Sequence, residues 1–184
     1  MQRITAMSPR LKARIAGVFY LVTFVTGVIG LVSVSGRFVA SLIAIVCYIA
    51  VTLLFYDLFK PVNRSLSLLA AFVSLLGCAS GALGLFRLTS AYISPMVFFG
   101  FYCLLIGTLI FKSTFLPRTL GALMACGGLG WLTFLSRPFA HYLSPYNFVP
   151  GLLAEGALTV WLLVVGIDVP KWEVMKPAEA RMHA

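Results

Sequence analysis

Acidic residues and histidines are scarce in this sequence. Its 184 residues include five Asp and Glu and two His. Acid–base catalysis, metal-assisted hydrolysis and activated nucleophiles all draw on these residue types at close spacing. The HExxH metal motif and the GxSxG nucleophile motif are absent as well. The sequence therefore does not favour an enzyme.

Cysteine is also sparse, and its spacing does not indicate a metal site or a disulfide framework. The four cysteines are Cys47, Cys78, Cys103 and Cys126. They fall one each in four apolar runs, and none forms a CxxC pair or a zinc-ligand spacing. A buried cysteine behaves as a small apolar side chain. We expect these residues to pack between helices, and we expect no metal and no cofactor.

Apolar residues, in contrast, are abundant. Hydrophobic residues make up 61% of the chain and charged residues 10%, whereas globular proteins average roughly 45–50% and about 25%. The charges are separated by apolar runs near 20 residues, the length at which a helix crosses a bilayer core about 30 Å thick. The pattern predicts an all-α, polytopic membrane protein.

Six transmembrane helices are predicted, within one membrane domain at 15–167. Because the links between them are short, neighbouring helices should pack antiparallel in a six-helix bundle. Residues 1–14 are predicted to form a basic cytoplasmic segment, and residues 168–184 a polar cytoplasmic tail. The predicted helices are 15–34, 38–56, 66–86, 95–111, 119–135 and 150–167.

The 14 Lys and Arg residues, which give a net charge of +9, predict the orientation. With six crossings, only Arg37, Arg87 and Arg137 fall on the side opposite both termini. Basic residues collect at the cytoplasmic side, so both termini should be cytoplasmic. His141 and His183 then lie on opposite sides and share no metal. Nucleic acid is not an expected partner, because basic stripes with interleaved aromatic residues are absent.

Small residues mark the expected contacts between helices. Gly77 and Gly81 form a GxxxG motif, which lets helix backbones approach closely in lipid. We expect this motif to serve packing inside one bundle rather than dimerisation. The predicted packing glycines are Gly27, Gly30, Gly77, Gly81 and Gly84.

Glu155 interrupts the last apolar run, VPGLLAEGALTVWLLVVG. An ionisable residue inside a membrane helix usually faces the bundle interior or a water-filled cavity. Its position predicts the outer half of the membrane, where we expect an ion pair with Arg87 or Arg137. The alternatives are a structural pair that fixes helix register and a functional ligand site. The candidate polar site comprises Glu155, Arg87, Arg137, Tyr92, Tyr142 and His141.

Two stretches resemble each other, RLTSAYISPMVF at 87–98 and RPFAHYLSPYNF at 137–148. One interpretation is chemical, because Arg and Tyr suit a membrane interface and Ser-Pro suits the start of a helix. The other is an internal repeat of the kind found in transporters. Pro150 is expected to kink or restart the sixth helix under either interpretation.

Four stretches together resemble the DUF4386 family of uncharacterised bacterial membrane proteins. They are RIAGVFYLVTFVTGV at 14–28, LFKPVNRSLSLLAA at 58–71, GTLIFKSTFLPRTLGALMACGGLGWL at 107–132 and AEGALTVWLLVVG at 154–166. The resemblance implies a polytopic protein of the bacterial inner membrane and implies no activity. The link between the first two helices is shorter here than in longer members of the family.

Two functions remain open at this point, and neither is an enzyme. The first is a protein of the lipid bilayer that binds or transports a small molecule or lipid through an outer-leaflet pocket near Glu155. The alternative is a structural or regulatory subunit that binds a partner membrane protein through its glycine faces and basic loops.

Overall fold

The computed structural model describes residues 7–33, 35–88 and 94–176. Within these ranges the regular elements are helices and no strand occurs, in agreement with the predicted all-α class. The elements are α1 (Pro9–Val32), α2 (Arg37–Phe59), α3 (Arg64–Leu85), α4 (Pro95–Lys112), α5 (Arg118–Leu132), the 3-10 turn η1 (Thr133–Leu135), α6 (Arg137–Leu143), α7 (Phe148–Val164) and α8 (Val169–Val174).

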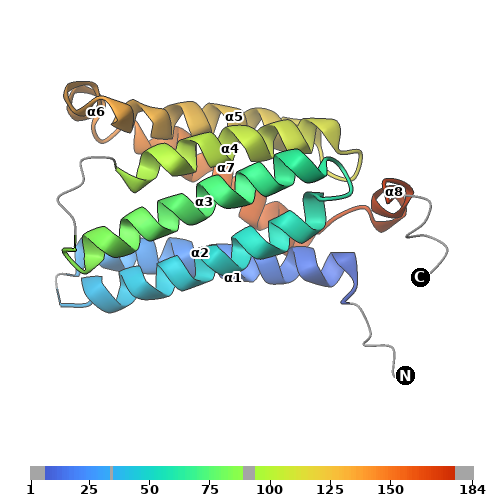
Figure 1. Cartoon of the computed structure of the whole chain (residues 1–184), viewed down its shortest axis with the longest axis horizontal. Helices are drawn as coiled ribbons and strands as arrows, with labels where there is room; N and C mark the ends of the chain where they lie inside the picture. The colour runs from blue at the N-terminus through green and yellow to red at the C-terminus, as the bar shows by residue number, and fades with distance from the viewer. Residues whose placement is uncertain (1–6, 34, 89–93, 177–184) are drawn as a thin grey trace.

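The long helices lie side by side along the long axis of the molecule, with α6 at one end and α8 at the other (Figure 1). Each of α1 to α4 packs against the next helix, α5 packs against α7, and α7 returns to α1. The helices therefore close into a ring. Its interior is filled by large buried side chains from different helices: Tyr20, Phe55, Tyr102, Met124 and Leu158.

Local capping chemistry sets several helix starts. Ser94 Oγ accepts a hydrogen bond from the amide of Met96, and Pro95 occupies the first turn of α4, as the Ser-Pro pattern predicts. The similar pair Ser144–Pro145 is used differently. Ser144 follows the last residue of α6, and α7 begins only at Phe148. The two similar stretches therefore do not play equivalent structural roles.

Four helices, α1 to α4, are long and apolar enough to cross a membrane. A fifth crossing results if α6 and α7, which are bent by 78° at their break, count as one. The chain is thus a helical protein of the polytopic type. In the predicted fifth and sixth segments, α5 has 15 residues and ends in the 3-10 turn, while α7 has 17 and ends before Gly166. Pro150 lies in the first turn of α7, so the chain restarts there rather than kinking a longer helix.

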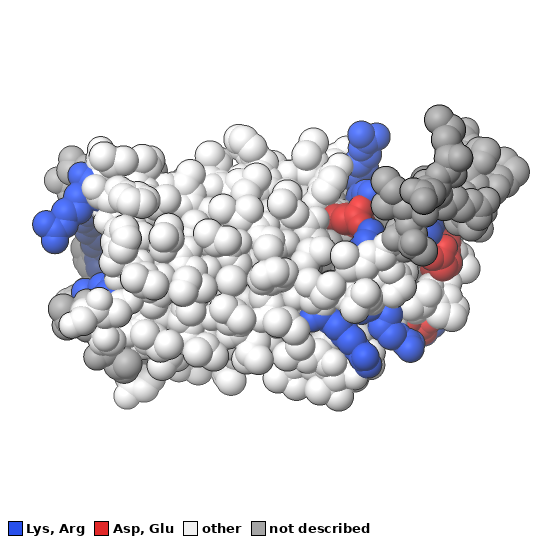
Figure 2. Space-filling view, turned by 90° about the horizontal axis from the view of Figure 1, so that it is seen from below, with Lys and Arg blue, Asp and Glu red and all other residues white. Residues whose placement is uncertain are grey.

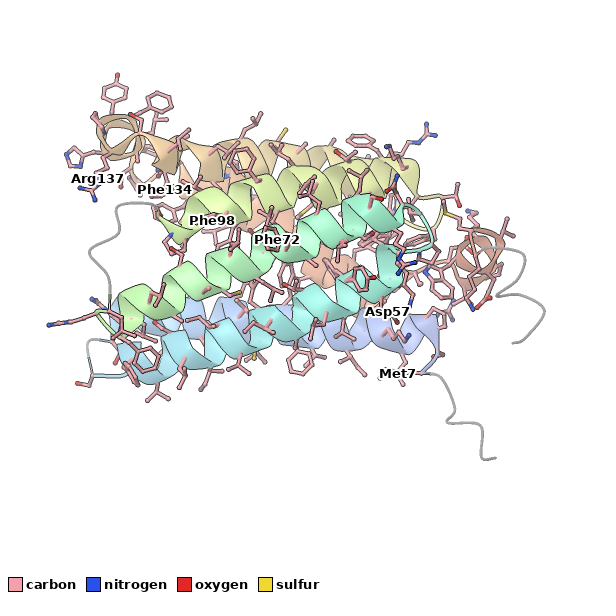
Figure 3. All side chains as sticks on the ribbon, in the orientation of Figure 1. Met7, Asp57, Phe72, Phe98, Phe134 and Arg137 are labelled. Atoms are coloured by element: carbon pink, nitrogen blue, oxygen red, sulfur yellow. The ribbon has the colours of Figure 1, made fainter. Side chains whose placement is uncertain are left out.

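The surface divides into charged ends and an apolar middle. On the face in Figure 2, Lys and Arg gather at both ends, and the broad band between them is free of charge. Figure 3 places Met7 and Asp57 toward one end and Arg137 at the other. Large apolar side chains such as Val25, Val46 and Leu53 are exposed on the band. A band of this kind suits lipid contact.

Candidate functional site

Glu155 lies on α7 at the inside of the ring, and 7% of its surface is exposed. Its Oε1 accepts a hydrogen bond of 2.7 Å from Trp131 Nε1 on α5. The same oxygen accepts a longer contact of 3.6 Å from Cys103 Sγ on α4. The carboxyl group therefore joins three helices of the ring.

Three buried tyrosines complete the surroundings. The hydroxyl oxygens of Tyr20 and Tyr48 lie 3.3 Å apart, and the ring centroids of Tyr48 and Tyr102 lie 5.9 Å apart. All three are close enough to Glu155 to interact with its carboxyl group electrostatically. The Tyr102 hydroxyl is buried without a hydrogen-bond partner in the described part of the chain. We name this set the polar centre: Tyr20, Tyr48, Tyr102, Cys103, Trp131 and Glu155.

Glycine makes room for the Trp131 indole. Gly151 lies one helical turn before Glu155, and a Cβ added to it would stand 2.2 Å from Trp131 Cε2. On the other side, the Phe148 ring meets the indole edge-on with centroids 5.7 Å apart. The indole is thus held between Phe148 and the α7 backbone, with its N–H directed at the carboxyl group.

The hydrogen-bond donors that reach Glu155 are formally neutral. Among the described residues, the ion pairs are Lys12–Asp57, Lys60–Asp57, Lys171–Asp168 and Lys176–Glu173, and none includes Glu155. A buried carboxylate without a cation costs several kcal/mol. The polar centre therefore suits a carboxyl group that carries a proton or binds a positively charged ligand.

The structure places the predicted partners of Glu155 elsewhere. Arg87 and Arg137 are exposed, at the end of α3 and the start of α6, and the bend before α7 directs α6 away from the ring. Glu155 lies seven residues into α7, roughly 10 Å along the helix. No ion pair joins Glu155 to either arginine in the described part of the chain. His141 and Tyr142 are exposed on α6, and Tyr92 lies outside the described residues.

The predicted packing glycines behave in three ways. A Cβ on Gly77 would stand 2.9 Å from the Phe99 ring, so this residue does allow α3 and α4 to approach. A Cβ added to Gly30 or Gly81 would make ordinary contacts, and one added to Gly27 or Gly84 would meet open space. The open positions lie on surfaces of α1 and α3 that no described residue covers.

The closest helix approach involves glycines that the sequence analysis did not single out. A Cβ on Gly128 would stand 2.7 Å from the carbonyl oxygen of Gly100, and one on Gly107 would stand 2.8 Å from that of Gly121. The backbones of α4 and α5 therefore touch at two levels. The sequence does carry a signal for this contact, because the two glycines in each helix are seven residues apart. This contact places Cys103, which lies between Gly100 and Gly107, at the polar centre.

The other members of the polar centre carried weaker signals. The sequence analysis assigned Cys103 to packing and did not select Trp131, Tyr20, Tyr48 or Tyr102. Aromatic residues are common in membrane helices, so their type alone does not identify a site. What distinguishes them is that different helices bring Trp131 and Cys103 to one carboxyl group, with the three buried tyrosines around it.

Comparison with known proteins agrees with the resemblance found in the sequence. The family described as "Domain of unknown function (DUF4386)" matches residues 33–94 and 89–166. An "Uncharacterized protein" from Archaeoglobus fulgidus is 26% identical over 131 residues, which cover 66% of this chain and 78% of that relative. No solved structure matches the chain significantly. These descriptions state no activity, and the function is unknown.

Proposed function

We propose, given that the chain belongs to the DUF4386 family, that it crosses the bacterial inner membrane six times with both termini in the cytoplasm. Helices α5 and α7 would supply the crossings beyond α1 to α4. Continued by η1, α5 spans 18 residues from Arg118 to Leu135, close to the roughly 20 that a crossing needs. Such short helices suit a locally thinned bilayer.

The distribution of basic residues supports this orientation. Arg37, Arg87 and Arg137 begin or follow helices at the α6 end of the molecule. More numerous basic residues lie at the opposite end, near the start of α1, which the positive-inside rule assigns to the cytoplasm. These are Arg10, Lys12, Arg14, Lys60, Arg64, Lys112, Arg118, Lys171 and Lys176.

We further propose that the polar centre binds a small cation, either a proton or a small protonated amine. One observation carries this proposal: the Glu155 carboxyl group is buried among neutral donors. A positive ligand neutralises the carboxylate, and the surrounding tyrosine rings attract cations through their π faces. The unpartnered Tyr102 hydroxyl supplies one more oxygen. Binding at this place would serve transport or sensing across the membrane.

The Trp131 indole is a built-in probe for this function, because its N–H bonds directly to Glu155. We would follow the indole N–H signals of the purified protein in detergent by NMR and assign Trp131 with a Trp131→Phe variant. The signal should move when pH is varied or methylammonium is added. The shift should disappear in Glu155→Gln and persist in the control Glu173→Gln, which removes an acid at the cytoplasmic end.

An identical response in Glu155→Gln and the native protein would refute cation binding at Glu155. A response to pH without one to methylammonium would restrict the ligand to a proton. No response, together with a membrane protein that co-purifies stoichiometrically, would favour the alternative of a structural or regulatory subunit. The open glycines Gly27 and Gly84 are where such a partner helix would meet this chain.

A further inference from the structure

A groove lies at the cytoplasmic end of the ring, away from the polar centre. It measures about 610 Å³ and is formed by the start of α1, the α4–α5 link, the end of α7 and the start of α8. Basic side chains and apolar side chains both line it. The residues that matter for its chemistry are Arg10, Lys171, Phe115, Leu116, Trp161 and Val165.

The walls of this groove are held in place by specific contacts. The amide of Asp168 donates to the carbonyl oxygen of Phe115 at 3.3 Å, which ties the α7–α8 link to the α4–α5 link. Trp172 on α8 is buried, and its Nε1 donates to the carbonyl oxygen of Leu58 at 2.8 Å. Gly166 turns the chain between α7 and α8 with φ +76°, a conformation that favours glycine. The groove is therefore a built feature of the fold.

The charge of the groove is positive overall. Asp168 pairs with Lys171 at 2.9 Å, and hydrogen bonds from Lys171 lower the pKa of Asp168, so this carboxyl group is ionised at neutral pH. Arg10 is near enough to Asp168 to lower the pKa of its carboxyl group further, but it forms no ion pair in the described part of the chain. Its guanidinium is thus available for a phosphate, with which it can form bidentate hydrogen bonds.

The apolar wall leads from the groove toward the lipid-facing band. Trp161 is half-buried, Val165 is exposed, and the neighbouring Val164 is 69% exposed on the outside of α7. A cationic pocket bordered by an apolar path at the membrane surface matches a lipid with a phosphate headgroup and an acyl chain. Basic pockets on the cytoplasmic side of membrane helices recognise such headgroups.

We propose that this groove binds one anionic phospholipid of the cytoplasmic leaflet, with its phosphate on Arg10 and Lys171 and an acyl chain along Trp161 and Val165. The proposal is independent of Glu155 and of the ligand of the polar centre. It assigns a lipid site to the α1, α7 and α8 junction, where the ring of helices closes.

The test is native mass spectrometry of the full chain released from nanodiscs that contain equal phosphatidylglycerol and phosphatidylcholine. We expect one phosphatidylglycerol to be retained preferentially on the native chain. Arg10→Gln should lower its retention about fivefold, the effect of one basic residue at an anionic surface. The matched control is Arg118→Gln, which removes an exposed arginine at the same end outside the groove and should retain the lipid. Circular dichroism would verify that both variants remain helical.

Several outcomes would overturn the proposal. Equal loss in the two variants would mean that general surface charge holds the lipid. Equal retention of the two phospholipids would mean that the groove recognises only apolar chains. Displacement of the lipid by inorganic phosphate would identify a site for a soluble anion. A preference that emerges only after removal of residues 177–184 would show that the chain's own C-terminal segment occupies the groove.

Discussion

Among single residues, Glu155 illustrates how a buried acid can be held by neutral donors. The hydrogen bond that it accepts from Trp131 can be tested through the free energy of unfolding of Glu155 variants. Glu155→Ala leaves the indole N–H without an acceptor, and we expect a loss of about 1–3 kcal/mol in the free energy of unfolding. Glu155→Gln keeps a carbonyl oxygen in the same place and should stay within about 1 kcal/mol of the native chain. Denaturant unfolding in detergent, followed by circular dichroism, measures both.

Substitutions of Arg87 and Arg137 provide the control for the Glu155 variants. Because neither Arg87 nor Arg137 reaches Glu155, Arg137→Leu combined with Glu155→Ala should be additive within roughly 0.5 kcal/mol. The same holds for Arg87→Leu. A coupling above about 1 kcal/mol would instead support the ion pair that the sequence predicts, in which removal of one partner is costly and removal of both is nearly neutral.

Among elements, the contact between α4 and α5 depends on reciprocal glycines. Gly107→Ala would place a Cβ 2.8 Å from the backbone oxygen of Gly121, and overpacking of this kind typically costs about 1–3 kcal/mol. Gly27→Ala is the control, because its Cβ faces open space. Alanine is the better helix former by about 1 kcal/mol, so this change should be neutral or stabilising. The thermal unfolding temperature should fall in Gly107→Ala and should stay the same or rise in Gly27→Ala, and equal losses would contradict this account of the contact.

The start of α4 was predictable because its cause is local, whereas the same Ser-Pro pattern at Ser8 and Pro9 starts α1 well before the predicted residue 15. Ser94 and Pro95 lie next to each other in the sequence and form the cap and first residue of α4. Helix ends were harder to predict from the sequence. Helix α5 ends in a 3-10 turn, and α7 ends shortly before a glycine with positive φ. Residues 137–143 were assigned to an outer loop, whereas they form α6. Their exposed aromatic and basic residues resemble a loop in composition.

The candidate site was predictable only in part. Glu155 is the single acidic residue in a long apolar run, so its position was evident from the sequence. Its partners were not, because an indole N–H and a thiol carry no charge pattern. The indole of Trp131 reaches the Glu155 carboxyl group because α5 packs against α7. No local sequence pattern encodes this contact.

For the whole molecule, the proposed six-span topology predicts which residues would face the periplasm. We would introduce single cysteines into a chain whose four native cysteines are replaced and label intact cells with a membrane-impermeant thiol reagent. Leu88→Cys and Tyr146→Cys should be labelled, because both positions are exposed at the α6 end. Ser65→Cys and Thr114→Cys should be labelled only after the cells are opened. The reverse pattern would place the termini outside.

The contact between α7 and α1 also fixes when the polar centre comes into existence. Among the described helices, α7 is the last long one in chain order, and it packs against both α5 and α1. Until it enters the membrane, the donors of Trp131 and Cys103 lack the acceptor that Glu155 supplies. A nascent chain that stops before residue 148 therefore has neither a closed ring of helices nor the Glu155 carboxyl group. Insertion of α7 and acquisition of the site are one event, and a closed α1–α7 contact distinguishes a chain with α7 in place from one without it.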